Sequence, residues 1–595
     1  MADAKPRSEG AGHAGGAFPT LEQMQHWTGV IGQAQQMMLE AMSAPLADAG
    51  AQMATRTMSP LPLPAPFGDP ARLAAAQADF WKDGLALWTR FLSAPGASGA
   101  PAPADKDRRF SAPQWRDNPV FDLIRQSYVL LCDHLLKGVD AIEGLDERQR
   151  GQLRFAMRAA TDALSPSNFA FTNPQVMEKA IETNGASLLK GLEHMLADLS
   201  RGQLTHTDTG AFELGRNIAA TPGKVIKETP LYQLIQYTPT TKQVRATPLI
   251  IFPPWINRFY ILDLNPQKSF IRWAVEQGLT VFVVSWKSAD ESLAHVTMDD
   301  YILSGQLDAI DTVRDLLDVE AVHAVGYCVA GTSLAALLAY LAATGEAAKV
   351  ASATFLTAQV DFSEAGDLKL FVDDNQLELV KGLAGDKGYL DGRYMAATFN
   401  LLRGRDLIWS YVVNNYLLGE DYPPFDLLYW NGDTTNLPAR WHTAYLTDLY
   451  RDNRLARPGG ISVAGVPIDL RRVTTPSYVQ AGREDHIAPP GSVWKITGHF
   501  AGPLRFVLAG SGHIAGVVNP PAAGKYQYWT NEAKAETLDE FLAGARETRG
   551  SWWPDWIEWI AALAPRRVAA KGARIPGGGK LPAIEDAPGR YVRAR

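Results

Sequence analysis

The chain has 595 residues, of which 46% are apolar and 20% are charged, a composition that excludes a fibrous or wholly disordered protein. Its 57 basic and 64 acidic residues give a net charge of −7, and no long block of either sign points to a dedicated nucleic-acid binder. Two cysteines, Cys132 and Cys328, are too few for a disulfide framework or a cysteine-built zinc site. We expect a globular protein of a reducing cytoplasm with two to four domains.

Residues 1–105 differ in composition from the rest of the chain, and we expect a variable, partly disordered N-terminal segment with two amphipathic helices. Apolar residues spaced by three and four positions predict amphipathic helices around residues 21–31 and 80–92, and proline-rich runs at 59–66 and 94–104 predict linkers. The aromatic face of the second helix could dock on the chain's own body, on a second subunit or on a hydrophobic partner. No apolar stretch fits a secretory signal or approaches the roughly 20 residues that cross a bilayer, so we expect the protein to stay inside the cell.

Residues 106–244 predict a helical N-terminal domain. Helix-length segments run over 119–136, 146–164 and 174–196. Asn118 and Asn173 each precede a proline, an arrangement typical of a capped helix start. Cys132 falls on the apolar face of the first of these helices, so we interpret it as a small core residue.

Residues 245–595 predict an α/β catalytic domain. Short apolar runs alternate with helix-length segments, which indicates a mainly parallel sheet buried on both faces; the expected strands are 248–252, 279–286, 322–327, 353–360, 476–481 and 504–508. A stretch rich in Tyr, Trp, Asn and Asp, residues 362–455, interrupts the alternation, and we interpret it as an inserted lid. A tail over 565–595 follows the last helix.

The strongest chemical motif is a strand, a tight turn and a helix around Cys328. The run Gly326-Tyr-Cys-Val-Ala-Gly331 matches the G-x-S-x-G nucleophile elbow with cysteine in place of serine. Small residues on both sides let the side chain project while the helix packs close to the strand. The free N–H groups of the helix start favour a thiolate, and the Val329 N–H is a candidate oxyanion donor.

An acid and a base follow the elbow in the order that this motif requires, each after a late strand. Asp485 follows the strand at 476–481, and His513 lies in a glycine-flanked turn after the strand at 504–508. Glu484 and His486 are the competing local candidates, and we interpret His486 as structural or supporting. A second oxyanion donor should come from the loop after the strand at 248–252, where a backbone N–H near Trp255 or Ile256 is our candidate.

Several longer motifs carry a family resemblance from about residue 109 to the end of the chain. They are RFSAPQWRDNPVF (109–121), LSPSNF (164–169), PWINRFYILDL (254–264), YVVNNYLLG (411–419), REDHIAP (483–489) and GSGHIAGVVNPP (510–521). With them the chain resembles the class I polyhydroxyalkanoate synthases, which belong to the α/β-hydrolase superfamily. One departure is visible: the family's box usually reads G-x-C-x-G-G, whereas Ala330 stands here at the first glycine of the closing pair.

This resemblance implies an acyltransferase that polymerises (R)-3-hydroxyacyl-CoA, usually with short acyl chains, into polyester with release of CoA. It implies that Cys328 is the nucleophile, His513 the base and Asp485 the third member, which either orients His513 or deprotonates the 3-hydroxyl group. It further implies a homodimer at a growing polymer granule, with granule-associated proteins as possible partners. We expect no metal and no cofactor beyond the CoA thioester substrate. A thioesterase or polyester depolymerase on the same fold, and a granule-coat protein with a vestigial site, are the alternatives.

Overall fold

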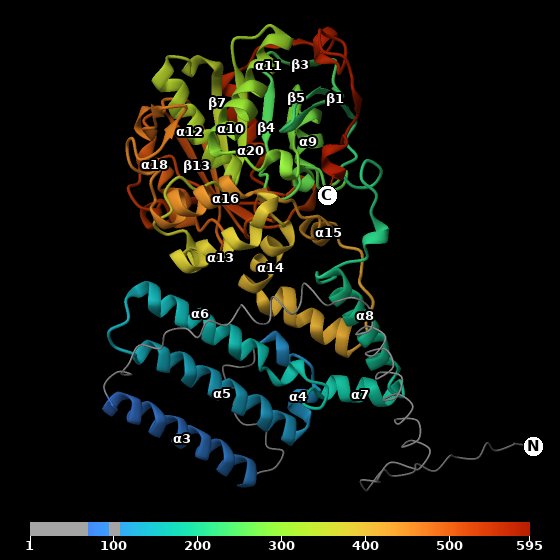
Figure 1. Ribbon diagram of the computed structural model, residues 1–595, viewed down its shortest axis with the longest axis vertical. Coiled ribbons are helices and arrows are strands. Elements are labelled where there is room, and N and C mark those ends of the chain that lie inside the picture. The colour runs from blue at the N-terminus through green and yellow to red at the C-terminus, as the bar shows by residue number, and fades with distance from the viewer. Residues whose placement is uncertain (1–69, 94–106, 595) are drawn as a thin grey trace, which may run out of the picture. The chain divides into compact units, whose positions relative to one another are not determined.

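The structure, a computed structural model, describes residues 70–93 and 107–594 (Figure 1). The chain divides into two compact units. The first holds the described residues up to Gly144 together with Met157–Leu204 and Ile408–Asp421, and the second holds Leu145–Ala156, Thr205–Leu407 and the residues from Tyr422 onward. The helix predicted around residues 21–31 and the two predicted linkers lie outside the described residues.

The first unit is built from helices. In chain order these are α3 (Pro70–Ser93), α4 (Gln114–Asp117), α5 (Pro119–Ala141), α6 (Glu147–Ala163, which continues from the second unit), α7 (Pro174–Glu182), α8 (Ala186–Arg201) and the π-helical turn η12 (Val412–Leu417). Helix α3 confirms the prediction for residues 80–92 and lies along α5 (Figure 1). Cys132 packs against the small aromatic core formed by Phe110, Trp115 and Tyr128, as expected.

The predicted helix caps are confirmed, and one predicted helix is wrong. The side chain of Asn118 accepts a hydrogen bond from the Val120 N–H at the start of α5, and Asn173 caps α7 in the same way. The single helix expected over 174–196 is broken into α7 and α8 at Asn184 and Gly185, whose φ angles are 49° and 85°. Positive φ values end a right-handed helix, and glycine adopts them at little cost.

The second unit is organised around one large sheet. Its strands are β1 (Gly223–Glu228), β2 (Tyr232–Tyr237), β4 (Leu249–Phe252), β5 (Val281–Trp286), β6 (Val322–Tyr327), β7 (Val350–Leu356), β12 (Ser477–Gly482), β13 (Leu504–Ala509), β14 (Gln527–Thr530), β15 (Arg546–Arg549) and β17 (Glu585–Asp586). They are ordered β15-β14-β13-β12-β7-β6-β4-β5-β2-β1-β17. All neighbours from β5 to β13 pair in parallel, and the strands at both edges are antiparallel.

All six predicted strands are present, and together they are the parallel part of this sheet. The expectation that residues 106–244 are helical throughout is wrong for β1 and β2, which join the sheet as antiparallel neighbours of β5. The alternation in these strands was masked by polar residues. Gln236 of β2 is buried, and its side-chain amide is satisfied there because it donates a hydrogen bond to the backbone carbonyl of Ala573 in the C-terminal tail.

Helices cover both faces of this sheet. Because successive side chains of a strand point to opposite faces, Ile250 and Phe252 of β4 enter one core cluster and Leu249 and Ile251 the other. The first cluster includes α11 (Asp308–Leu317) and α12 (Val329–Thr344), and the second includes α9 (Phe270–Glu276) and α20 (Trp553–Leu563). The result is the three-layer α/β architecture expected from the sequence.

Helical segments occupy the predicted lid between β7 and β12. They are α13 (Asp374–Ala384), α14 (Gly392–Leu402), α15 (Asp426–Gly432), α16 (Ala439–Ala444) and the π-helical turns η11 (Arg405–Trp409), η12 and η13 (Tyr445–Arg451). Short helices α17 (Pro490–Trp494), α18 (Ile496–His499) and α19 (Leu538–Ala543) follow β12 and β14, and α10 (Met298–Asp300) and the π-helical turn η7 (Tyr301–Leu307) precede α11. The short strands are β3 (Gln243–Arg245), β8 (Tyr389–Leu390), β9 (Leu437–Pro438), β10 (Ser462–Val463), β11 (Val466–Pro467) and β16 (Arg567–Ala569). No helix in the described ranges is long and apolar enough to cross a membrane.

Candidate active site

Cys328 lies at the sharp turn between β6 and α12. Its φ of 53° and ψ of −126° are unfavourable for any residue with a Cβ, and such strain is concentrated at functional sites. Close packing holds the turn in place: a Cβ on Gly326 would lie 2.6 Å from the Cα of Gly331, and one on Gly331 would lie 2.4 Å from the Cβ of Ala358. Glycine is therefore required at both positions. Ala330 is fully buried, and its methyl group is accommodated within the core.

The register of the sheet brings Asp485 and His513 together. Strands β12 and β13 pair in parallel up to Gly482 and Ala509, so the loops that leave their carboxyl ends lie next to each other. The Nδ1 of His513 is 2.6 Å from Oδ2 of Asp485. The other carboxylate oxygen, Oδ1, accepts hydrogen bonds from the backbone N–H groups of Ile487 at 2.8 Å and Ala488 at 2.9 Å. The buried carboxylate thus has its position fixed on both sides.

The electrostatics of His513 link it to the cysteine. Burial lowers the pKa of His513, but interactions with Asp485 and Cys328 outweigh this effect and raise the pKa to about 10. A proton is therefore retained on the His513 imidazole at neutral pH. The structure places all three predicted residues in one cluster, and Tyr327 adds a hydrogen bond from its hydroxyl to the His513 carbonyl oxygen at 3.0 Å.

The competing residues in the acid loop behave differently. Glu484 is exposed. Burial lowers the pKa of His486, and the positive charge of Arg403 lowers it further, so His486 is neutral where His513 is charged. Among Glu484, Asp485 and His486, only Asp485 forms a hydrogen bond with the His513 side chain in the described part of the chain. This geometry favours Asp485 as the partner of His513.

The two candidate oxyanion donors are the backbone N–H groups of Val329 and Ile256. Val329 is the first residue of α12, and Ile256 lies in the loop after β4. Within residues 70–93 and 107–594, neither amide donates a hydrogen bond to another protein group. Backbone N–H groups that are fixed and unoccupied can stabilise the oxyanion of a tetrahedral intermediate. Their role at Cys328 stays a prediction.

Contacts from the lid brace the loop that carries Ile256. The sequence did not predict these contacts. Asn257 has a φ of 102°, and its N–H donates to the Thr435 hydroxyl oxygen at 2.7 Å. That hydroxyl in turn donates to the Trp255 carbonyl at 2.8 Å. Thr435 thus holds the peptide groups on either side of Ile256. No local sequence signal reveals a bond between residues 178 positions apart.

Two buried tyrosines of the lid lie close enough to Cys328 to interact with its charge. Tyr445 and Tyr450 lie on η13, with ring centroids 5.4 Å apart. Burial raises the pKa of each tyrosine hydroxyl, and the nearby charge of Cys328 raises both further. The abundance of Tyr and Trp in the predicted lid indicated that aromatic residues matter in this segment, but it did not identify Tyr445 and Tyr450 among them.

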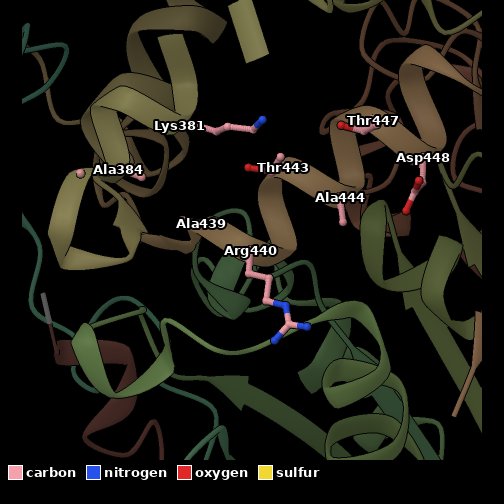
Figure 2. Close-up of a pocket in the computed structure, with 9 residues that line it drawn as sticks. Lys381, Ala384, Ala439, Arg440, Thr443, Ala444, Thr447 and Asp448 are labelled. Atoms are coloured by element: carbon pink, nitrogen blue, oxygen red, sulfur yellow. The ribbon is translucent and has the colours of Figure 1, made fainter. Parts of the chain in front are cut away.

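A separate pocket lies on the lid, and it does not contain the candidate catalytic residues. It has a volume of about 450 Å³ and is lined by residues of α13, α16 and η13, including Lys381, Arg440 and Thr443. Figure 2 shows Lys381 and Thr443 on facing helices, whereas the side chain of Arg440 extends away from Lys381. In the described residues, no group of three or more His, Cys, Asp or Glu side chains is placed to hold a metal ion.

Comparison with known proteins gives two family matches along the chain. Residues 106–274 match the poly-beta-hydroxybutyrate polymerase (PhaC) N-terminus, and residues 248–520 match the alpha/beta hydrolase fold. The second match agrees with the three-layer architecture and with the elbow at Cys328. The fold is therefore an α/β-hydrolase fold with an inserted helical segment.

Curated relatives extend the likeness over most of the chain. The poly(3-hydroxyalkanoate) polymerase subunit PhaC of Rhizobium meliloti (strain 1021) is 46% identical over 89% of this chain and 87% of its own length. The poly(3-hydroxyalkanoate) polymerase of Methylorubrum extorquens is 46% identical over 89% of this chain and 88% of its own. The corresponding subunit of Cupriavidus necator is 45% identical over 88% of this chain and 89% of its own.

Proposed function

The chain belongs to the poly(3-hydroxyalkanoate) polymerase family, and from this membership we infer that it is an acyltransferase that polymerises hydroxyacyl-CoA into polyhydroxyalkanoate with release of CoA. The substrate that fits is (R)-3-hydroxyacyl-CoA with a short acyl chain, such as 3-hydroxybutyryl-CoA. The observation that carries the mechanism is the 2.6 Å pair of His513 and Asp485 beside a strained Cys328. Cys328 acts as nucleophile, and His513 moves the proton.

The first step transfers an acyl group from CoA to the enzyme. The Cys328 thiolate attacks the thioester carbonyl, a carbon–sulfur bond forms at Cys328, and the bond to the CoA sulfur breaks. The proton on His513 passes to the departing CoA thiolate, which leaves His513 neutral. The N–H groups of Val329 and Ile256 stabilise the oxyanion of the tetrahedral intermediate.

The second step lengthens the chain. The 3-hydroxyl of a hydroxyacyl-CoA attacks the Cys328 thioester, its proton passes to neutral His513, an ester bond forms and the bond to Cys328 breaks. This restores the thiolate and the imidazolium, and the lengthened chain returns from CoA to Cys328 by the exchange of the first step. Asp485 orients His513 and stabilises its charge; direct deprotonation of the hydroxyl by Asp485 is the alternative role.

Cysteine suits this cycle better than serine. Exchange of one thioester for another is nearly neutral in free energy, so the acyl group remains activated for the next ester bond. A serine would form an oxoester and lose that activation before the chain grows. Water must be kept out because hydrolysis of the acyl-enzyme ends a chain, and the buried tyrosines of η13 are placed to exclude it.

The wider setting of the reaction rests on the family likeness and on the chemistry of the product. We propose that the enzyme works in the cytoplasm at the surface of polymer granules, because the polyester is insoluble in water. We further propose a homodimer, contacts with granule-associated proteins, and no cofactor or metal beyond the CoA thioester substrate. Sedimentation of the purified protein tests the homodimer. Recovery of the protein with granules after cell lysis tests its association with granules.

The direct test compares two cysteine variants with (R)-3-hydroxybutyryl-CoA as substrate. Cys328→Ala should release no CoA above background and form no polymer, because the nucleophile is absent. Cys132→Ala is the matched control: it removes the other thiol from a core cluster remote in sequence, and it should retain the wild-type rate. Polymer formation by Cys328→Ala at the wild-type rate would contradict catalysis at this residue. Release of free acid without polymer by the wild-type enzyme would favour the thioesterase alternative.

A further inference from the structure

Gln359 is a buried polar residue that lies just beyond the end of β7. Only 5% of its surface is exposed. A buried amide costs free energy unless its donors and acceptors are satisfied, so its partners show what it stabilises. Its Nε2 donates to the carbonyl oxygen of Ile487 at 3.1 Å. Its Oε1 lies 2.8 Å from the Ser492 hydroxyl, whose proton is shared between this oxygen and the Asp361 carbonyl oxygen, 2.6 Å away.

The Ile487 contact reaches the catalytic acid through one peptide unit. The N–H of Ile487 donates to Oδ1 of Asp485, and the carbonyl of Ile487 accepts from Gln359. Ile487 is thus held from both sides, by the carboxylate and by the amide. Since Oδ2 of the same carboxylate bonds to His513, a shift of Ile487 would move the carboxylate away from the imidazole.

Gln359 is itself fixed to the element that carries the nucleophile. Its backbone carbonyl accepts a hydrogen bond from the Thr332 hydroxyl at 2.7 Å, and Thr332 lies in the first turn of α12, directly after Cys328. The Gln359 side chain also lies close enough to Tyr450, a lid tyrosine, to lower the pKa of its hydroxyl. One residue therefore joins the nucleophile helix to the acid loop and lies close to the lid.

We propose that Gln359 is a positioning residue. It holds the Asp485 loop in the position that the hydrogen bond between His513 and Asp485 requires. This inference rests on the proposed roles of the three catalytic residues. Gln359 touches no reacting atom and acts through Ile487. An apolar side chain in its place would leave the Ile487 carbonyl and the Ser492 hydroxyl without this partner, and a glutamate would place an acceptor against the carbonyl.

The test compares Gln359→Met with the matched control Gln480→Met. Gln480 is also a fully buried amide, in β12, but neither of its side-chain polar atoms has a hydrogen-bond partner in the part of the chain that the structure describes. Methionine has nearly the same shape as glutamine. Gln359→Met should lower kcat with 3-hydroxybutyryl-CoA by tenfold or more, by about 100-fold for a displacement near 1 Å, with a smaller change in KM. Gln480→Met should retain the wild-type kcat because no hydrogen bond is lost.

A second readout separates positioning from a general structural effect and needs no turnover. The rate at which iodoacetamide alkylates Cys328 is measured against pH, by mass spectrometry of the peptide that carries it. In the wild-type chain the upper step of this profile should lie near pH 10, where His513 loses its proton. Loosening of Asp485 should move that step down by about one pH unit in Gln359→Met and leave it unmoved in Gln480→Met. The other groups that face this pair are Tyr327, Tyr445, Tyr450 and His486. Gln480→Met alters none of them. Gln359→Met removes a side chain that lowers the pKa of Tyr450, and this loss leaves Tyr450 protonated because burial already raises its pKa.

Ser492→Ala provides a milder version of the same perturbation should Gln359→Met fold poorly. It removes the hydroxyl that lies 2.8 Å from Oε1 of Gln359 and that also donates to the Asp361 carbonyl oxygen at 2.6 Å, and it should lower kcat about fivefold and shift the alkylation profile in the same direction. Wild-type kcat and an unshifted profile in these two variants would overturn the inference while leaving the proposed function intact. Full activity of Cys328→Ala would instead refute the proposed function.

Discussion

Gly331→Ala perturbs the elbow at its tightest point. The added Cβ would lie 2.4 Å from the Cβ of Ala358 and 2.9 Å from the carbonyl oxygen of Gly326. Ordinary carbon–carbon contact is about 3.5 Å, so the two carbons must separate by about 1.1 Å (3.5 − 2.4). Overpacking of this kind costs about 1–3 kcal/mol of the free energy of unfolding.

Activity should fall more than stability in this variant. The start of α12 must move away from β6, and Cys328 is joined directly to that helix start. A displacement near 1 Å at the nucleophile costs about 100-fold in kcat. The assay is CoA release from (R)-3-hydroxybutyryl-CoA, together with urea denaturation of the same preparation.

Gly382→Ala is the matched control for this substitution. Gly382 lies inside α13, and a Cβ built there meets no atom within 4 Å. Because glycine is a poor helix former, alanine should stabilise the protein by about 1 kcal/mol and leave kcat unchanged. Wild-type kcat in Gly331→Ala would refute the claim that close packing behind the elbow sets the position of Cys328.

Further predictions concern the acid, the oxyanion loop and pH. Asp485→Asn should lower kcat by about 10³–10⁴-fold, because an amide does not hold His513 in the required tautomer or stabilise its charge; a loss below tenfold would contradict this role. Thr435→Val should lower kcat about tenfold, since the peptide groups on both sides of Ile256 lose their partner; unchanged kcat would remove support for this donor. Burial lowers the pKa of His442 to about 4, so the unfolded chain takes up a proton first and stability falls as the pH drops from about 6.5 to 4. The raised pKa of His513, about 10, adds stability that is full below pH 6.5 and is lost as the pH rises toward 10. Urea denaturation at pH 5, 6.5 and 9 should therefore show the largest free energy of unfolding at pH 6.5, and a continued rise to pH 9 would contradict the assignment for His513.

The elbow and its two partners could be predicted because their signals are local. Cys328 is flanked by small residues between an apolar strand and a helix, and Asp485 and His513 each follow a buried strand in the order that the fold requires. The parallel register of β12 and β13 then brings the last two together without further information. The central part of the sheet was predictable for the same reason, since its strands are continuous apolar runs.

The remainder depends on contacts between distant parts of the chain. Strand β2 is fully buried yet includes Gln233 and Gln236, whose amides bond to residues of the C-terminal tail, so its composition does not read as a buried strand. Thr435 and Gln359 are likewise defined by partners more than 100 positions away. A single sequence contains no signal for such pairs, because the hydrogen bonds exist only once the chain has folded.

The central claim is that the growing acyl chain is carried on Cys328. Mixing the enzyme with (R)-3-hydroxybutyryl-CoA, quenching in acid and mapping the modified peptide by mass spectrometry tests it directly. The mechanism predicts a hydroxybutyryl or oligomer adduct on the peptide that contains Cys328, released by neutral hydroxylamine as a thioester should be. Polymer formation with no adduct at Cys328, or with the adduct on another residue, would contradict the mechanism.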